Sequence, residues 1–288
     1  MAEAIGKIDL HMHTTASDGT DTPEGLIEAV GAAGISLFSV TDHDGVEAAK
    51  IIPPRLKGKK LRFLSGVEFS CRDDGGKYHI LGYGFDPLHE AIRSVVDHGH
   101  ELRMKKVTAR LDFLKEKFGF AFSDEDTAEL LSLDNPGKPH IGNLMVKYGF
   151  AKDKKEAIDV YINQVHFKNQ NVSPEEAIEG ILKSGGIPVL AHPFYGSGSE
   201  LILGEGMEER LGRLKAMGLQ GLEAYYSGFS VKLQNEALSL AREYDLYVTA
   251  GSDYHGANKL VRIGDTGLRE TDAYPPELLG FLEAAIGF

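Results

Sequence analysis

The sequence predicts an α/β protein whose strands form a barrel-like sheet, and three observations carry this prediction. Short apolar segments alternate with helical segments, as in parallel βαβ units. The first strand–helix–strand unit lies within residues 7–41, and similar segments recur toward the C-terminus. Several of these strands end on histidine or an acid. Because the active sites of α/β barrels form at the carboxyl ends of the strands, the sequence places its chemistry at one rim.

The N-terminal unit can be followed residue by residue. Residues 7–13 alternate apolar and polar side chains, as a strand with two different faces does. The apolar side chains are Ile8, Leu10 and Met12, and the polar ones are Asp9, His11 and His13. Thr22 is a favoured N-cap followed by proline, which predicts a helix that ends near Gly34. A second strand is expected at residues 37–41, directly before Asp42 and His43.

The remaining elements of the barrel follow the same pattern. Further strands are predicted at residues 61–64, 77–83, 187–191, 222–225 and 247–250. Helices are predicted at residues 174–183, 207–217 and 231–244. The pair Gly75-Gly76 predicts a hairpin turn before the strand at 77–83. Most of these connections are long enough to cross from one parallel strand to the next.

Residues 91–171 interrupt this rhythm. No strand pattern occurs there, and residues 91–117 are predicted to form one long helix. The segment is slightly basic, whereas the whole chain carries a net charge of -12. We expect residues 91–171 to form a helical insertion that caps a barrel made of residues 1–90 and 172–288. The alternative interpretation is a surface excursion without function.

Composition excludes several classes of protein. The 288 residues are 42% hydrophobic and 26% charged, as in a soluble globular chain. The acidic balance argues against a platform for duplex DNA, and no run of apolar residues is long enough to cross a membrane. The single cysteine, Cys71, excludes an internal disulfide framework and is expected to be a buried small hydrophobe. With no secretory signal pattern at the N-terminus, a cytoplasmic location is expected.

Nine ligand-type side chains lie in or just after the predicted strands. They are His11, His13, Asp18, His43, Glu68, His79, His192, Asp253 and His255. Burying such groups without partners would cost several kcal/mol each, whereas divalent metals bind neutral imidazole and carboxylate together. The pair His98 and His100 has the spacing of His11 and His13 but lies in a predicted helix, where residues two apart do not share a face. We therefore interpret the nine groups as a metal site and the helical pair as solvated surface.

The motifs that carry these groups resemble those of the polymerase and histidinol phosphatase (PHP) family of metal-dependent phosphoesterases. They are Asp9-Leu10-His11-Met12-His13, Ser17-Asp18-Gly19, Thr41-Asp42-His43, Gly66-Val67-Glu68, His79-Ile80-Leu81-Gly82, Ala191-His192-Pro193 and Gly251-Ser252-Asp253-Tyr254-His255. They occur in family order and cover nearly the whole chain. The resemblance implies a distorted (β/α)7 barrel that holds two or three divalent ions, with Mn, Fe and Zn as candidates.

The resemblance also implies how the nine groups share the ions. His11 and His13 would bind one ion with Asp253. Glu68 would bridge to a second ion completed by His79 and His192, and Asp18, His43 and His255 would hold a third. Glu68, His43, Asp253 and His255 are the residues expected to act in catalysis. Asp42 and Asp44 are candidates to orient His43, although a helix cap or a solvated turn is an equal interpretation of both.

The insertion resembles that of nucleotide phosphatases within the family, a group that includes 3',5'-nucleoside bisphosphate phosphatases and 5'-3' exoribonucleases acting on short RNA. It implies substrate contacts by Arg103 and His140, with Lys106 a weaker candidate. The chain has Lys138 and Asn143 where arginines are usual, and lysine does not bind phosphate bidentately. His140 could instead cap a helix, and Arg103 could be helix surface. Tyr225 and Tyr226 are expected to pack in the barrel wall rather than stack on a base.

The function expected from these motifs is hydrolysis of a phosphomonoester of a small nucleotide, with the 3'-phosphate of a nucleoside 3',5'-bisphosphate as the leading substrate. The alternatives are a 5'-3' exoribonuclease on short RNA and a histidinol-phosphate phosphatase. Amidohydrolase-type C–N hydrolysis shares the His-x-His start but usually uses a bridging lysine, where this chain has Glu68. A metal-binding regulatory module is the non-enzymatic alternative.

Overall fold

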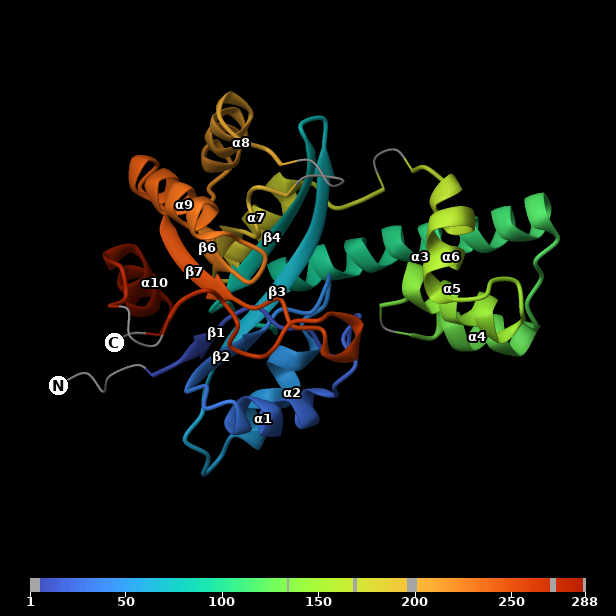
Figure 1. The fold of residues 1–288 in the computed structure, drawn as a ribbon, viewed down its shortest axis with the longest axis horizontal. Coiled ribbons are helices and arrows are strands. Elements are labelled where there is room, and N and C mark those ends of the chain that lie inside the picture. Colours follow the sequence, from blue (N-terminus) through green and yellow to red (C-terminus); the bar gives the residue numbers. More distant parts are fainter. Residues whose placement is uncertain (1–5, 134, 168–169, 196–200, 270–272, 287–288) are drawn as a thin grey trace. The chain divides into compact units, whose positions relative to one another are not determined.

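The computed structural model describes residues 6–133, 135–167, 170–195, 201–269 and 273–286 (Figure 1). Its strands are β1 (Ile8–Asp9), β2 (Leu37–Val40), β3 (Arg62–Asp73), β4 (Gly76–Tyr83), β5 (Ile187–Leu190), β6 (Gly221–Tyr226) and β7 (Tyr247–Gly251). Its α-helices are α1 (Pro23–Ala32), α2 (Glu47–Arg55), α3 (Glu90–Phe118), α4 (Asp124–Leu131), α5 (Lys138–Lys147), α6 (Lys154–Glu156), α7 (Pro174–Lys183), α8 (Glu205–Ala216), α9 (Val231–Glu243) and α10 (Pro276–Ile286). No helix in the described ranges is both long enough and apolar enough to span a membrane.

The chain divides into two compact units, residues 1–96 with 172–288, and residues 97–171. We call the first the barrel unit and the second the helical unit. Helix α3 begins in the first unit and continues into the second. The helical unit contains no strand among its described residues. It has its own apolar core, in which Val107 and Leu114 of α3 and Ile141 and Met145 of α5 are buried.

The sheet of the barrel unit has seven strands in the order β1 to β7, and it is nearly closed (Figure 1). The backbone N–H of Leu10 donates to the carbonyl of Ala250 at 2.9 Å, which joins the first strand region to β7. Met12 forms a parallel bridge with Tyr254 further along the same seam. The expected α/β barrel is confirmed.

The first strand is shorter than predicted. Only Ile8–Asp9 forms a regular strand, although the alternation continues to His13. Beyond Asp9 the chain lies between two neighbours, and its backbone bonds alternate between them: Leu10 bonds to Ala250, and Thr41 donates to the carbonyl of Met12. Both Leu10 and Met12 are fully buried. The predicted two-faced segment is therefore present, but it pairs too irregularly to count as one strand.

One strand runs against the others. β4 is antiparallel to β3 and to β5, whereas the remaining pairs are parallel. The hairpin predicted at Gly75-Gly76 produces this reversal, because β3 continues to Asp73 and β4 starts at Gly76. The N-terminal half of β4 consequently lies at the end of the barrel where the parallel strands finish. This reversal brings His79 to the same rim as the other predicted ligands.

The helices that the sequence predicted for the barrel are present with small shifts of their ends. Thr22 caps α1 by accepting a hydrogen bond from the N–H of Gly25, as its position before a proline predicted. Ser173 caps α7 in the same way. Helices α2 and α10 were not predicted. α2 is only nine residues long and contains Pro53 and Pro54 in its last turn, which is why its sequence does not look helical.

Candidate metal centre

Nine side chains converge at the rim where the parallel strands end. His11 and His13 follow β1, His43 follows β2, His192 follows β5, and Asp253 with His255 follow β7. Glu68 lies within β3 at the level where β2 has ended, because His43 and Glu68 form a parallel bridge. The structure thus brings together all nine groups named from the sequence, although they are spread over 245 positions of the chain.

The Glu68 carboxylate lies at the centre of this cluster and is 1% exposed. Its Oε2 atom lies 3.3 Å from His11 Nε2, 3.2 Å from His13 Nε2 and 3.2 Å from His43 Nδ1. Its Oε1 atom lies 2.8 Å from His79 Nδ1 and 3.2 Å from His192 Nε2. One carboxylate therefore contacts five imidazoles, a position suited to bridging cations that those imidazoles bind.

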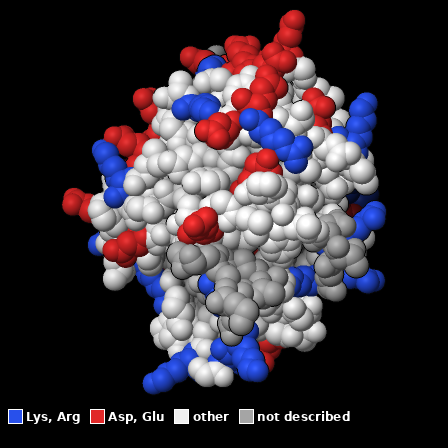
Figure 2. Space-filling model, turned by 90° about the vertical axis from the view of Figure 1, so that its left-hand side faces the viewer, with Lys and Arg blue, Asp and Glu red and all other residues white. Residues whose placement is uncertain are grey.

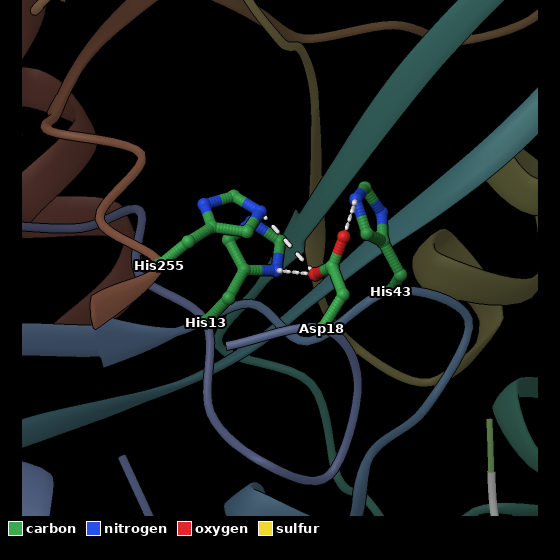
Figure 3. Close-up of side chains that lie close together, drawn as sticks. All are labelled: His13, Asp18, His43 and His255. Atoms are coloured by element: carbon green, nitrogen blue, oxygen red, sulfur yellow. Dashed lines mark ion pairs between the residues drawn. The ribbon is translucent and has the colours of Figure 1, made fainter. Parts of the chain in front are cut away.

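Asp18 organises a second part of the cluster (Figure 3). Its Oδ1 atom lies 3.2 Å from His255 Nε2 and 3.8 Å from His13 Nδ1, and its Oδ2 atom lies 3.9 Å from His43 Nε2. The three rings surround the carboxylate in the close-up. Asp18 is also one of the more open members of the cluster, since its side chain is 33% exposed.

Among the residues that the structure describes, three sets of ligand atoms lie close enough together to hold one ion each. They are His13, Asp18, His43 and His255; His11, His13 and Asp253; and His43, Glu68 and His79. The second set equals the first ion site implied by the family resemblance. In the third set His43 takes the place expected for His192, whose Nε2 nevertheless lies 3.2 Å from Glu68 Oε1. Imidazole with carboxylate suits Mn, Fe and Zn.

The charges of the cluster are unbalanced in a way that a bound cation would correct. The Nε2 atoms of His11 and His13 are buried and make no hydrogen bond to any described residue. Burial alone would raise the pKa of Glu68, but the surrounding imidazoles, His43 foremost, hold that pKa well below its usual range. Burial lowers the pKa of His43 to about 4, so its ring is neutral and able to ligate at neutral pH. The residues therefore fit divalent metal ions.

Two predicted ligands have left-handed backbone conformations. His192 has a φ of 27° and Asp253 has a φ of 58°. Such values are uncommon outside glycine and cost about 1–3 kcal/mol when the surroundings enforce them. The surroundings do enforce them here: the N–H of His192 donates to Glu223, and the N–H of Asp253 donates to the carbonyl of His11. The backbone is thus bent where it turns two side chains into the cluster.

Comparison with known proteins agrees with this geometry. The family model described as the PHP domain matches residues 9–171, more than half of the chain. The chain belongs to the PHP family. It is a metal-dependent phosphoesterase with several buried metal-site clusters.

Relatives within the PHP family differ in activity. A 5'-3' exoribonuclease of Haemophilus influenzae is 29% identical over 255 residues, which is 86% of this chain and 90% of the relative. A 3',5'-nucleoside bisphosphate phosphatase of Chromobacterium violaceum is 28% identical over 281 residues, with 94% of each chain covered. A phosphoribosyl 1,2-cyclic phosphate 1,2-diphosphodiesterase of Eggerthella lenta is 28% identical over 274 residues.

Two solved structures are similar over nearly the whole chain. A protein of Bifidobacterium adolescentis assigned as a metal-dependent phosphoesterase has a TM-score of 0.80 and 25% identity, with 98% of both chains covered. A structure of Chromobacterium violaceum described as an amidohydrolase, solved with sulfate and without metal, has a TM-score of 0.78 and 28% identity. It covers 97% of this chain and 96% of its own.

The PHP cluster is held by residues that the sequence analysis did not single out. Glu223 on β6 is fully buried, and its two oxygens accept hydrogen bonds from His11 Nδ1 and from the backbone N–H of His192, both at 2.8 Å. The signal for Glu223 was present: it is an acid within the otherwise apolar strand predicted at residues 222–225. Because it bonds Nδ1 of His11, it directs Nε2 of that ring toward the cluster.

Tyr226 and Lys259 hold Asp253 from the other side. The Tyr226 hydroxyl donates to Asp253 Oδ2 at 2.8 Å, and Lys259 Nζ contacts the same oxygen. Tyr226 is 7% exposed and packs against Phe229, as expected for a residue of the barrel wall. The expectation that Tyr226 packs in the barrel wall did not include this hydrogen bond from its hydroxyl to Asp253. Oδ1 of Asp253 is left facing the imidazoles of His11 and His13.

Asp42 accepts hydrogen bonds from the loop that follows His13, and Asp44 accepts one from strand β3. The buried Asp42 carboxylate accepts hydrogen bonds from the N–H and hydroxyl of Thr14 and from the hydroxyl of Ser17. It thereby fixes the loop that presents Asp18. Asp44 accepts a hydrogen bond from the N–H of Ser70 on β3 at 2.8 Å.

The residues named as substrate contacts belong to the helical unit. Arg103 and Lys106 lie on α3, and His140 lies in the first turn of α5. His140 Nδ1 accepts a hydrogen bond from the N–H of Gly137, so it caps α5 as the alternative interpretation stated. Lys138 donates to the side chain of Asn163 at 2.5 Å. His140 also lines a pocket of about 240 Å³ with Asn143 and Lys147 of α5 and Asp126 of α4.

Proposed function

We propose that this PHP phosphoesterase hydrolyses the 3'-phosphate of nucleoside 3',5'-bisphosphates. The observation that carries the proposal is the complete set of nine ligand-type groups around Glu68 in a chain that matches a bisphosphate phosphatase over 94% of both lengths. A bisphosphate carries two anionic groups, and a cluster of cations attracts them strongly.

Divalent ions in such a site acidify a bound water to a pKa of about 7 and neutralise charge on the phosphoryl oxygens. The residues of this chain would hold and orient those ions: Glu68 and Asp253 would supply the central carboxylates, while His43 and His255 would ligate beside Asp18. Asp18 and His79 are each about one-third exposed, whereas His11 and His13 are buried. The phosphoryl group of the substrate therefore reaches the cluster from the side of Asp18 and His79.

The helical unit is proposed to act as a cap that recognises the nucleotide. Arg103 and His140 are the proposed contacts to phosphate or base, with Lys106 as a weaker contact. The arginine provides a planar fork that matches phosphate oxygens. The cap would limit the length of the substrate, which favours a mononucleotide. Figure 2 shows acidic and basic side chains interspersed on one face of the molecule, with no continuous basic surface among its described residues.

A 5'-3' exoribonuclease activity on short RNA is the second candidate, and a specific observation favours it. Exoribonucleases of Haemophilus influenzae, Salmonella typhimurium and Escherichia coli are 27–29% identical to this chain. Phosphate release from adenosine 3',5'-bisphosphate is compared with mononucleotide release from 5'-phosphorylated RNA of two to five nucleotides. A higher kcat/KM on the bisphosphate supports the leading proposal, and a higher value on RNA overturns it in favour of the second.

The role of the cluster is tested with Glu68→Gln and with the matched control Glu24→Gln on the exposed side of α1. Glu68→Gln removes the charge that five imidazoles share, so we expect turnover to fall by at least about 100-fold, as for the loss of a major electrostatic contact. Glu24→Gln is expected to keep the wild-type rate. Circular dichroism establishes that both variants are folded. A folded Glu68→Gln enzyme with full turnover contradicts the ligand assignment.

A further inference from the structure

The two oxygens of the Asp253 carboxylate have different surroundings. Oδ1 lies 3.4–3.6 Å from three imidazole nitrogens, those of His11, His13 and His255. Oδ2 is contacted instead by the Tyr226 hydroxyl at 2.8 Å and by the ammonium group of Lys259. The Asp253 side chain is 8% exposed, so its oxygens are bonded mainly to protein groups rather than to bulk water.

Lys259 and Tyr226 occupy Oδ2 together. Lys259 Nζ lies 3.3 Å from the Tyr226 hydroxyl oxygen and 5.7 Å from the centre of the Tyr226 ring. The hydroxyl donates its one proton to Asp253, so it accepts from the ammonium group. The three side chains are therefore bonded to one another in a closed triangle. A carboxylate oxygen offers about two lone pairs, and these two donors use both lone pairs of Oδ2.

The backbone before Lys259 is fastened to the loop that carries Asp18. The N–H of Ala257 donates to Thr20 Oγ1 at 2.9 Å. The side-chain amide of Asn258 donates to the carbonyl of Asp18 at 2.8 Å. Because both hydrogen bonds tie this turn to the cluster, Lys259 is held beside its carboxylate although its own side chain is 36% exposed.

We propose that Lys259 is a positioning residue that makes Asp253 a one-oxygen ligand and thereby selects among divalent ions. With Oδ2 taken, Oδ1 alone is left for the ion shared with His11 and His13. Ca²⁺ is large and often takes both oxygens of a carboxylate within a shell of about six to eight oxygens. Ions held largely by imidazole need one oxygen from each acid. The occupied Oδ2 therefore disfavours Ca²⁺ relative to a smaller ion such as Mn²⁺.

The charge of Lys259 and its place on Oδ2 have separable effects. A fixed positive charge repels Mn²⁺ and Ca²⁺ alike, because the two ions carry the same charge. Removing that charge strengthens the binding of both ions by the same factor. Freeing a lone pair of Oδ2 favours only the ion that can use it. The ratio of the two affinities therefore reports the positioning role and cancels the effect of charge.

The test compares Lys259→Met with Lys232→Met in the full chain. Lys232 is an exposed residue of α9 that is not bonded to Asp253, so its substitution removes the same charge and leaves Oδ2 occupied. Metal-free protein is loaded with Mn²⁺, and electron paramagnetic resonance of the unbound ion follows its displacement by added Ca²⁺. Asp253→Asn identifies the ion that this carboxylate holds, because the affinity for that ion falls.

We expect Lys259→Met to shift the ratio of affinities toward Ca²⁺ by about tenfold, a typical effect of a residue bonded to a metal ligand. Lys232→Met is expected to keep the wild-type ratio. Lys259→Arg, which keeps a donor on Oδ2, should restore it. Tyr226→Phe frees the other lone pair of Oδ2 without changing the charge, so it should shift the ratio in the same direction as Lys259→Met and serves if the methionine variant does not fold.

The proposal rests on Asp253 being a metal ligand of the phosphoesterase, but not on which phosphomonoester is hydrolysed. An unchanged ratio in Lys259→Met, beside weakened binding in Asp253→Asn, overturns the role of Lys259 alone. This holds even if both affinities rise equally, since Lys259 would then act through its charge only. Wild-type affinity for every ion in Asp253→Asn overturns the proposal together with the ligand assignment.

Discussion

Replacing Glu223 by glutamine tests whether this carboxylate orients a ligand of the metal cluster. Its two oxygens accept from His11 Nδ1 and from the N–H of His192 at 2.8 Å each. Glutamine has one acceptor oxygen, so one of these donors must then face the amide NH2. If the NH2 faces His11, that ring places its proton on Nε2, the atom turned toward the cluster. If it faces His192, two donors are opposed where the backbone is already bent.

Either arrangement removes one hydrogen bond to a charged group, which is worth about 1.5–3 kcal/mol. Loss of a carboxylate behind a ligating histidine typically weakens metal binding by about 10–100-fold, or about 1.4–2.7 kcal/mol. The free energy of the lost hydrogen bond and that of the weakened metal binding are therefore of the same size. We therefore expect Glu223→Gln to bind its most weakly held ion about 10–100-fold less tightly than the wild type does.

The assay is a titration of metal-free protein with Mn²⁺, followed by electron paramagnetic resonance of the unbound ion. Glu236→Gln, an exposed acid on α9, is the matched control. Nitrogen NMR of the histidine rings reports the tautomer of His11 independently of any activity. A Glu223→Gln protein with wild-type affinity, stoichiometry and His11 tautomer would refute the positioning role.

Two further predictions concern stability. Burial lowers the pKa of His13, but the Asp253 and Glu68 carboxylates outweigh it and raise that pKa from 6.5 to about 9. The protonated ring therefore stabilises the metal-free fold. This contribution is complete below pH 6.5 and is lost as the pH rises through about 9. Urea unfolding of chelator-treated protein should show lower stability at pH 9 than at pH 6, and the reverse order would contradict it. Gly251→Ala should destabilise the fold by about 1–3 kcal/mol, because its Cβ would lie 2.1 Å from His11 Cβ and 2.6 Å from Glu223 Oε1. Gly280→Ala, whose Cβ would meet nothing closer than 3.5 Å, is the control, and equal stability of the two variants would count against the argument.

The sequence was sufficient to find the groups that converge on the cluster, because strand periodicity places His11 and His13 on one face and strand ends lie at one rim. It did not show which groups support them. Glu223 is 212 positions from His11 along the chain, and only the closed sheet brings the two together. The predicted hairpin at Gly75-Gly76 implied the antiparallel course of β4, but the sequence pattern did not show that this reversal is what places His79 at the rim.

The helical unit was less predictable for a related reason. Its helices follow from apolar periodicity, and α3 was expected within one residue of its observed ends. Arg110 of α3 is 9% exposed. This burial depends on what surrounds it in three dimensions, and a sequence pattern cannot distinguish a solvated arginine from a buried one. Phe167, which covers its guanidinium, lies 57 residues further along the chain.

The seam between the two ends of the barrel has a consequence for biosynthesis. His11 and His13 are synthesised about 240 residues before Asp253 and the β7 backbone that anchors Leu10. A growing chain thus exposes a pair of imidazoles long before their carboxylate exists. Firm capture of the ion in that set must await the synthesis of Asp253 and the closure of the seam between the first strand and β7.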